Sequence, residues 1–226
     1  MRKGMLIVFL GTVGVGKTTI IKSLAELFKE KDQRVHTGFL KAFHGTSYVL
    51  HVLIVKMLKL RSKGRSAPWF ILAKTGRSST SKALLIISLY LDAFFNIPLK
   101  LIYFELLRIL GYDVFVEEYI YTTLFDYICE AKHTLKMKNY PKLPFKILLA
   151  LLTKYKPDKV VVFTTCPKDL LARWKIRGYG DPQPRYVKLL DRYCLNLVSH
   201  PKKIIINTCG LDIRKTVALV YKLISS

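Results

Sequence analysis

A glycine-rich stretch close to the start of the chain, GTVGVGKTT, has residue types and a spacing suited to binding phosphate. It fits the pattern GxxxxGK[ST], with Gly11, Gly16, Lys17 and Thr18 at the four defined positions. In such a loop, backbone N–H groups point inward and the following helix presents its positive N-terminal end to an anion. The lysine would contact the outer phosphates, and the threonine hydroxyl would bind the Mg²⁺ that accompanies a nucleoside triphosphate. We therefore predict an ATP and Mg²⁺ site made by Gly11, Thr12, Val13, Gly14, Val15, Gly16, Lys17, Thr18 and Thr19.

The elements on either side of this loop have the required order. The residues from Met5 to Leu10 form an apolar run typical of a buried strand. The residues from Lys17 to Lys31 have apolar side chains at helical spacing. A strand, the loop and a helix therefore follow one another, which favours the phosphate-binding interpretation over an ordinary glycine turn.

The rest of the chain alternates short apolar runs with helical patterns. Further strands are expected at 34–40, 113–117, 159–164 and 203–207, with helices between them. The apolar stretch 83–110 is interrupted by charged residues and a proline, so we expect two buried helices there and not a membrane span. Apolar strands separated by helices indicate an α/β fold, with a five-stranded parallel sheet covered on both faces.

Charge is the most unusual feature of the composition. The 226 residues include 38 Lys and Arg against 15 Asp and Glu, a net charge of +23. No acidic residue lies between Asp32 and Asp92. This is consistent with a lysine-rich solubilising surface, or with a surface that attracts phosphates, nucleic acid or anionic lipid. We expect a single domain, 1–226, in which the Gly-, Ser- and Pro-containing stretch 61–82 is a mobile basic segment.

The cysteines and histidines give little support to a metal centre. The four cysteines are Cys129, Cys166, Cys194 and Cys209, which form no CxxC pair and have no histidine at ligand spacing. We therefore expect reduced core thiols and a cytoplasmic protein.

Acidic side chains are expected where the third strand ends. In a parallel sheet of this kind the site lies at the carboxyl ends of the strands, and Glu117 and Glu118 stand there. Adjacent strand residues point in opposite directions, so only one of them, Glu117, is expected to face the nucleotide. Its carboxylate would hold Mg²⁺ through water or orient the attacking acceptor oxygen.

At these residues the chain resembles the thymidylate kinase group of P-loop nucleoside monophosphate kinases, with the deoxynucleoside kinases as structural relatives. The stretch VEEYIYTT is similar to the family motif after the third strand, with Glu117 at the acid and Tyr119 at the aromatic position. Glu118 stands where thymidylate kinases have an arginine. The corresponding motif of the deoxynucleoside kinases is matched at Glu117 and Tyr121. The resemblance covers nearly the whole chain in element order and implies a three-layer α/β/α P-loop kinase fold with a lid.

Two further stretches extend the resemblance to the lid and the substrate loop. TTCPKDLLARWKIRG is similar to the family's path from the fourth strand into an arginine-bearing lid helix, and we expect a lid at 173–186. Arg173 and Arg177 share a helix face and would neutralise charge on the transferring group; exposed basic residues are also common without such a role. KAFHGT occupies the place of the family's substrate loop, where Lys41 would hold an acceptor phosphate and Phe43 would stack on a base. Asp92 matches an aspartate of the family.

These observations predict an enzyme that transfers the γ-phosphoryl of ATP·Mg²⁺ to a nucleoside monophosphate. Lys17, Glu117, Arg173 and Arg177 would be catalytic, and Thr18 and Glu117 would hold the metal. The substrate would meet Lys41, Phe43, Asp92, Tyr119 and Tyr121. The alternatives are a kinase for a nucleoside or another small molecule, and a P-loop NTPase whose basic segment binds nucleic acid or an anionic membrane. A homodimer is also left open.

Overall fold

The computed structural model describes residues 2–60, 68, 71–72, 78–176 and 184–225. The five strands lie where the apolar runs predict them. They are β1 (Leu6–Gly11), β2 (Val35–Phe39), β3 (Asp113–Glu117), β4 (Lys159–Thr164) and β5 (Lys203–Asn207). All neighbouring strands are parallel, in the order β2-β3-β1-β4-β5.

The register of the sheet sets the ends of β1, β3 and β4 side by side. Phe9 pairs with Glu117 of β3, and Gly11 pairs with Phe163 of β4. The glycine-rich loop, residues 11–19, thus leaves the sheet next to the end of β3. This is the edge at which α/β sheets place their ligand sites.

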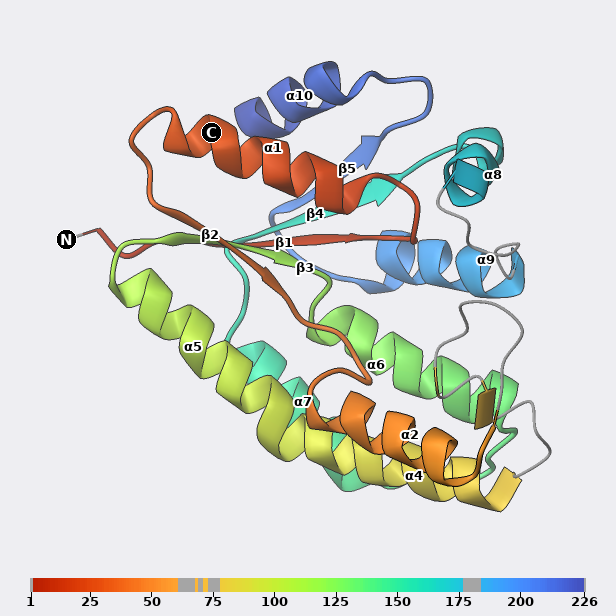
Figure 1. The fold of residues 1–226 in the computed structure, drawn as a ribbon. Helices are drawn as coiled ribbons and strands as arrows, with labels where there is room; N and C mark the ends of the chain where they lie inside the picture. The colour runs from red at the N-terminus through yellow and green to blue at the C-terminus, as the bar shows by residue number, and fades with distance from the viewer. Residues whose placement is uncertain (1, 61–67, 69–70, 73–77, 177–183, 226) are drawn as a thin grey trace. The chain divides into compact units, whose positions relative to one another are not determined.

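Helices cover both faces of the sheet, as predicted (Figure 1). The helices α1 (Lys17–Lys29) and α10 (Ile213–Ser225) lie together on one face. Their apolar sides pack on inward-facing strand residues such as Phe9, Phe115 and Phe163. On the other face lies α5 (Ile97–Ile109), whose Phe104 ring fills the space above Gly38. The protein is therefore a three-layer α/β/α fold.

The described part of the chain has six further α-helices. They are α2 (Thr46–Met57), α4 (Ser78–Leu91), α6 (Ile120–Cys129), α7 (Lys142–Lys154), α8 (Pro167–Ile176) and α9 (Pro184–Arg192). Three π-helical turns are η1 (Asp92–Asn96), η2 (Glu130–Thr134) and η3 (Tyr193–Leu197). The chain forms two compact units: Met1–Leu40 with Ile102–Tyr119 and Lys156–Ser226, and Lys41–Leu101 with Ile120–Tyr155. The first, the sheet unit, contains the five strands, and the second, the helical unit, contains α2, α4, α6 and α7.

The apolar stretch 83–110 forms one continuous helix, which corrects the expectation of two buried helices. It runs from Ser78 to Ile109 through the π-helical turn η1. Pro98 has no N–H to donate, and just before it the N–H of Ile97 bonds to the carbonyl of Asp92, five residues back. The wider turn lets the helix continue past the proline. Less than half of its most apolar window, 39%, is buried.

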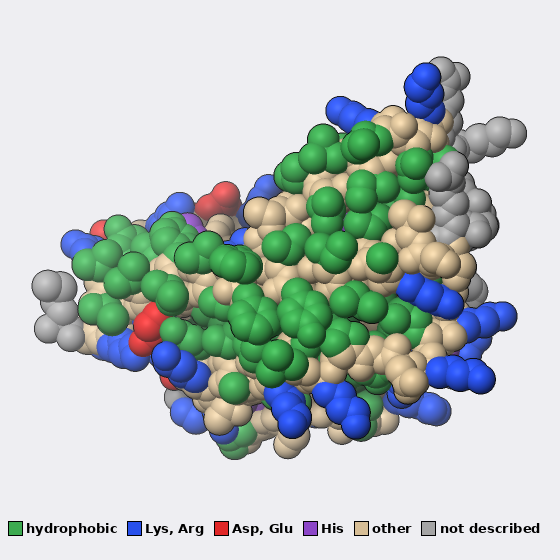
Figure 2. Space-filling view, turned by 90° about the horizontal axis from the view of Figure 1, so that it is seen from below, with side chains coloured by type: hydrophobic (Ala, Val, Ile, Leu, Met, Phe, Trp, Pro, Cys, Tyr) green, Lys and Arg blue, Asp and Glu red, His purple; other side chains and the backbone are tan. Residues whose placement is uncertain are grey.

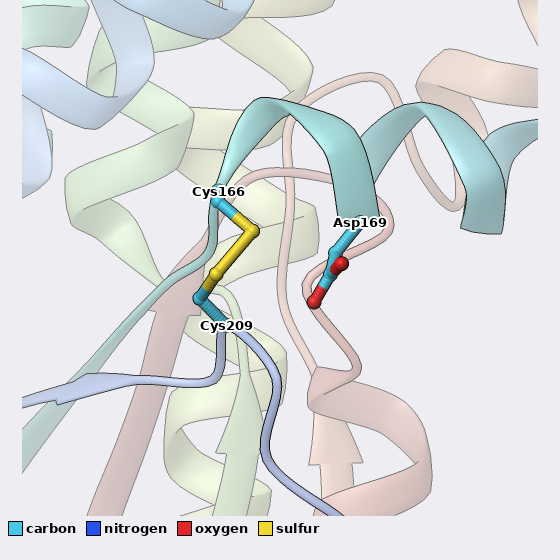
Figure 3. A group of neighbouring side chains, drawn as sticks. All are labelled: Cys166, Asp169 and Cys209. Atoms are coloured by element: carbon cyan, nitrogen blue, oxygen red, sulfur yellow. A yellow bond between two sulfur atoms is a disulfide. The ribbon is translucent and has the colours of Figure 1, made fainter.

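Two cysteines are joined, so the expectation that all four are reduced thiols is wrong. Cys166, just before α8, and Cys209, in the loop after β5, form a disulfide (Figure 3). Asp169 lies beside this bond, and its carboxylate accepts a hydrogen bond from the N–H of Gly210. A metal would need free thiolates, so the three side chains are not a metal-ligand set while the disulfide is formed. The sequence could not reveal this pair because 43 residues separate its members.

Removing the disulfide is expected to lower the free energy of unfolding by about 2–4 kcal/mol, because the bond restricts the unfolded chain. The double variant Cys166→Ala/Cys209→Ala should show this loss in urea unfolding. A reductant should destabilise the wild type by a similar amount and leave the double variant unchanged. Equal stability of the wild type with and without reductant would contradict the prediction.

Candidate functional site

The glycine-rich loop is held in a shape that side chains could not adopt. Gly11, Gly14 and Gly16 have φ angles of 140°, 97° and 101°, in a region that favours glycine. A Cβ on Gly11 would lie 2.4 Å from the carbonyl oxygen of Phe163. A Cβ on Gly14 would lie 2.7 Å from the indole of Trp174. The loop therefore packs closely on the neighbouring strand and helix, and α1 begins at Gly16 without a side-chain cap.

Lys17 is enclosed by the loop and is 4% exposed. Its Nζ donates hydrogen bonds to the carbonyls of Gly11 (2.6 Å) and Thr12 (3.1 Å). It also lies 3.0 Å from Oε1 of Glu118. These contacts hold the ammonium group at the centre of the loop.

Thr18 and Glu117 join the start of α1 to the end of β3. The threonine hydroxyl lies 2.8 Å and 3.0 Å from the two carboxylate oxygens of Glu117. Both groups are predicted metal ligands, and the structure brings them together. A hydroxyl and a carboxylate are the oxygen donors that Mg²⁺ prefers.

Glu118 also reaches the loop, contrary to the expectation that only Glu117 would. It lies just past the end of β3, at a φ of 64°, so it does not follow the alternation of a strand. Its side chain is turned inward and forms the buried ion pair with Lys17. Left-handed backbone at a non-glycine residue is costly and concentrates at functional sites. Nothing in the residue types from Glu117 to Tyr119 indicates that the backbone at Glu118 is left-handed.

Two side chains of α8 hold the backbone of the loop by hydrogen bonds. Arg173 donates a hydrogen bond to the carbonyl of Val15 at 2.9 Å. The indole N–H of Trp174 donates to the carbonyl of Val13 at 2.7 Å. Arg173, a predicted catalytic residue, is thus in contact with the loop backbone, whereas the contribution of Trp174 was missed by sequence reasoning. A tryptophan buries its ring and needs one acceptor for its N–H group. This combination is a feature of the sequence that can indicate such a role.

Parts of the predicted lid and basic segment lie outside the described residues. Arg177 and residues 178–183 belong to this group, as do 61–67, 69–70 and 73–77 of the basic segment. Their predicted roles stay predictions.

A pocket of about 260 Å³ opens beside the loop. Residues 14–16 of the loop line it, together with Thr19 and Ile20 of α1 and Arg173 of α8. The remaining lining residues are Ile176, Thr208, Leu211, Ile213 and Thr216. Apolar side chains with a few hydroxyls and one cation suit a flat, partly polar ring system.

Asp191 of α9 is a further acidic group near the loop. Burial raises the pKa of its carboxyl, while the positive charge of Lys17 acts in the opposite direction. This residue was not singled out from the sequence, because α9 follows the undescribed stretch 177–183 and no motif surrounds it.

In the helical unit, Asp92 is the centre of a buried polar network. It is 1% exposed and accepts hydrogen bonds from the N–H of Phe43, the hydroxyls of Ser47 and Tyr127, and the amide of Asn96, at 2.6–3.0 Å. Burial, followed by the Asp92 carboxylate, raises the pKa of Tyr127 well above its ordinary value, so the phenol remains a donor. Asp92 thereby ties the KAFHGT loop to η1.

The other predicted substrate residues are mostly enclosed. Lys41 forms an ion pair with Asp126 at 3.8 Å. Phe43 is buried against the ring of Tyr127, with centroids 4.7 Å apart. Tyr119 is fully buried in the sheet unit, and burial of Tyr121 in the helical unit raises the pKa of its phenol. Their substrate roles stay predictions.

Glu130 gives the helical unit a measurable pH dependence. Burial, with a smaller effect of the Asp126 charge, raises its pKa from an ordinary 4.5 to about 7, although a hydrogen bond from Thr134 opposes the shift. Between these two values the folded protein holds a proton that the unfolded chain has lost. The stability therefore falls as the pH rises towards about 7, by about 3 kcal/mol in total.

Urea unfolding at about pH 5 and about pH 8 checks this expectation. The Glu130→Gln variant should lack this part of the pH dependence. Subtracting the pH profile of the variant from that of the wild type also cancels the contribution of His51. Burial lowers the pKa of His51, so its contribution to the stability changes with pH in the opposite direction. Identical pH profiles of the wild type and the variant would contradict the prediction.

Comparison with solved structures identifies the fold. A thymidylate kinase from Candida albicans superimposes with a TM-score of 0.58 over 99% of this chain and 92% of that one, at 14% identity. The chain has a thymidylate kinase-like fold. No protein-family model and no curated protein sequence matches it. The fold agrees with the resemblance inferred from the glycine-rich loop and VEEYIYTT.

Proposed function

We propose that the protein is a kinase that transfers the γ-phosphoryl group of ATP·Mg²⁺ to a nucleoside monophosphate. The observation that supports it most is the pairing of Lys17 with Glu118 and of Thr18 with Glu117, where the glycine-rich loop meets the end of β3. This edge of the sheet is where α/β proteins bind nucleotides. The thymidylate kinase-like fold favours the same reaction class. A cytoplasmic location is part of the proposal.

The residues of the loop fit both the nucleotide and its metal. Gly11 and Gly14 leave no room for a side chain, and in a loop of this kind backbone N–H groups bind phosphate oxygens. Thr18 and Glu117 offer the oxygen donors that Mg²⁺ needs, and the bound ion would neutralise charge on the β- and γ-phosphates. Lys17 would exchange its carbonyl partners for phosphate oxygens. Glu117 would orient the acceptor oxygen, and Arg173 would hold the loop while lining the pocket for the base.

A second acceptor class is favoured by two observations. Glu118 stands where the resemblance gives thymidylate kinases an arginine, and it places a negative charge beside Lys17. Lys41, the predicted cation for an acceptor phosphate, is already paired with Asp126. A neutral hydroxyl, as in a nucleoside, would avoid repulsion from Glu118. A nucleoside kinase is therefore the alternative.

Mass spectrometry of reaction products separates these possibilities. The protein is incubated with ATP·Mg²⁺ and a pool of nucleosides and nucleoside monophosphates, with Lys17→Ala as the control. A Lys17-dependent nucleoside diphosphate is the expected product, and its mass identifies the base. A new monophosphate would select the nucleoside kinase. ADP alone, or no product, would contradict both.

A further inference from the structure

The disulfide joins two segments that both contact the glycine-rich loop. Cys166 lies just before α8, the helix whose side chains donate hydrogen bonds to the loop carbonyls. Cys209 directly follows Thr208, in the loop after β5. The two segments and the glycine-rich loop all belong to the sheet unit. The covalent link therefore lies next to the contacts that shape the loop.

These contacts converge on the backbone of the glycine-rich loop. From α8, Arg173 donates to the carbonyl of Val15 at 2.9 Å, and Trp174 donates to the carbonyl of Val13 at 2.7 Å. From the loop after β5, the hydroxyl of Thr208 lies 3.3 Å from the same carbonyl of Val15. Arg173 also lies 3.5 Å from the hydroxyl and the carbonyl of Thr208. The carbonyl of Val15 is thus held from both segments that the disulfide joins.

A hydrogen bond beside the disulfide links the same two segments. The carboxylate of Asp169, in the first turn of α8, accepts it from the N–H of Gly210 at 2.9 Å. Gly210 is exposed and Asp169 is half-buried, so water competes for both partners and the bond adds little stability. The disulfide is the part of this connection that water does not weaken.

The disulfide is accessible to a reductant. Neither cysteine is buried, and the adjacent residues Pro167, Lys168 and Gly210 are exposed. Disulfides of cytoplasmic proteins are usually transient and are often redox-sensing. An accessible disulfide beside the proposed nucleotide loop of a protein proposed to be cytoplasmic suits such a role.

We infer that the bond between Cys166 and Cys209 is a redox switch that acts on the glycine-rich loop and is opened by a dithiol reductant. In the bonded state, α8 and the loop after β5 are held together around the carbonyls of Val13 and Val15. A preorganised loop binds its ligand more tightly, because less conformational freedom is lost on binding. Reduction lets the two segments move independently, so the loop becomes more mobile and its affinity for nucleotide falls. The effect on nucleotide rests on the proposed function, whereas the effect on the loop does not.

The reduction is a balanced two-electron exchange. A thiolate of the dithiol attacks Sγ of Cys209, and Sγ of Cys166 leaves as a thiolate. The carbonyl of Cys166 accepts a hydrogen bond from the N–H of Leu170, so this cysteine lies at the N-terminal end of α8, whose positive charge stabilises the thiolate. Asp169 lies near both sulfur atoms and does not favour one over the other. The second thiolate of the dithiol then releases Cys209. The dithiol becomes a disulfide, and its two protons pass to the two cysteines.

Hydrogen exchange of the full chain, before and after reduction with dithiothreitol, tests the switch. Alkylation followed by mass spectrometry confirms which cysteines are reduced. At short labelling times we expect reduction to speed the exchange of amides 12–16 and of α8. The amides of β3 should not change, because they exchange only when the core opens. The dissociation constant of ATP·Mg²⁺, measured by calorimetry without an acceptor, should rise by about fivefold or more on reduction.

Two variants and one control measurement make the test specific. Cys166→Ser/Cys209→Ser should behave like the reduced wild type and should not respond to dithiothreitol. If this variant does not fold, the reduced wild type gives the same comparison without a substitution. Cys129→Ser, in α6, removes a cysteine that is not disulfide-bonded and should respond like the wild type. Hydrophobic side chains are exposed on the face shown in Figure 2, so association of copies could also protect amides. Both redox states should therefore sediment alike.

The outcomes separate the switch from the proposed function. Equal loop exchange in the two redox states would overturn the inference. So would a response that the double variant keeps, a response that follows a change in sedimentation, or a nucleotide affinity that reduction leaves unchanged. Loop exchange that responds to reduction, with no nucleotide binding in either state, would support the switch and contradict the proposed function.

Discussion

Replacing Asp92 with alanine is expected to lower the free energy of unfolding by about 3–5 kcal/mol. The change removes an acceptor shared by four donors in the helical unit: the N–H of Phe43, the hydroxyls of Ser47 and Tyr127, and the amide of Asn96. Ser47 and Asn96 keep weaker bonds to the carbonyls of Ser88 and His44. Each unsatisfied buried donor costs about 1–3 kcal/mol, and partial rearrangement keeps the total below the sum. Chemical denaturation followed by circular dichroism measures the loss.

Two variants make the Asp92 experiment specific. Tyr127→Phe removes one of the four donors and should cost about 1 kcal/mol. Glu26→Ala, at an exposed acidic residue of α1, should change the stability by less than about 0.5 kcal/mol. If Asp92→Ala were no more destabilising than Glu26→Ala, Asp92 would not be the centre of the network.

Replacing Lys17 with alanine is expected to reduce phosphoryl transfer by about 10²–10³-fold. In the proposed reaction this ammonium group is the cation closest to the transferring phosphate, and it is buried at the centre of the loop. Lys22→Ala, at an exposed lysine of the same helix, should keep full activity. The measurement is the initial rate of product formation with the acceptor that the mass-spectrometric experiment identifies.

The Lys17 variant also removes the cation that pairs with Glu118 inside the protein. Breaking a buried pair from one side is costly, so some loss of stability is expected together with the loss of activity. The double variant Lys17→Ala/Glu118→Ala should regain part of that stability and none of the activity. Recovery of both would mean that Lys17 acts only by holding the fold.

The fold was predictable because its strands are buried apolar runs and its helices have apolar residues at helical spacing. The loop was predictable because backbone geometry and phosphate chemistry restrict the residue types at Gly11, Gly16, Lys17 and Thr18. Three features escaped because they depend on the folded chain. Glu118 reaches Lys17 through a single left-handed residue, Trp174 meets the loop from a distant helix, and Pro98 is accommodated by a π-helical turn.

The bond between Cys166 and Cys209 also determines how the chain would come apart when cut. Both α8 and α9 lie within the covalent ring that this bond closes. A protease that cleaves any one peptide bond between these cysteines leaves the N- and C-terminal pieces attached to each other. The nicked protein keeps the mass of a single molecule on a non-reducing gel and separates into two fragments only after reduction. Proteolytic mapping of the chain between Cys166 and Cys209 therefore needs both a non-reducing and a reducing gel.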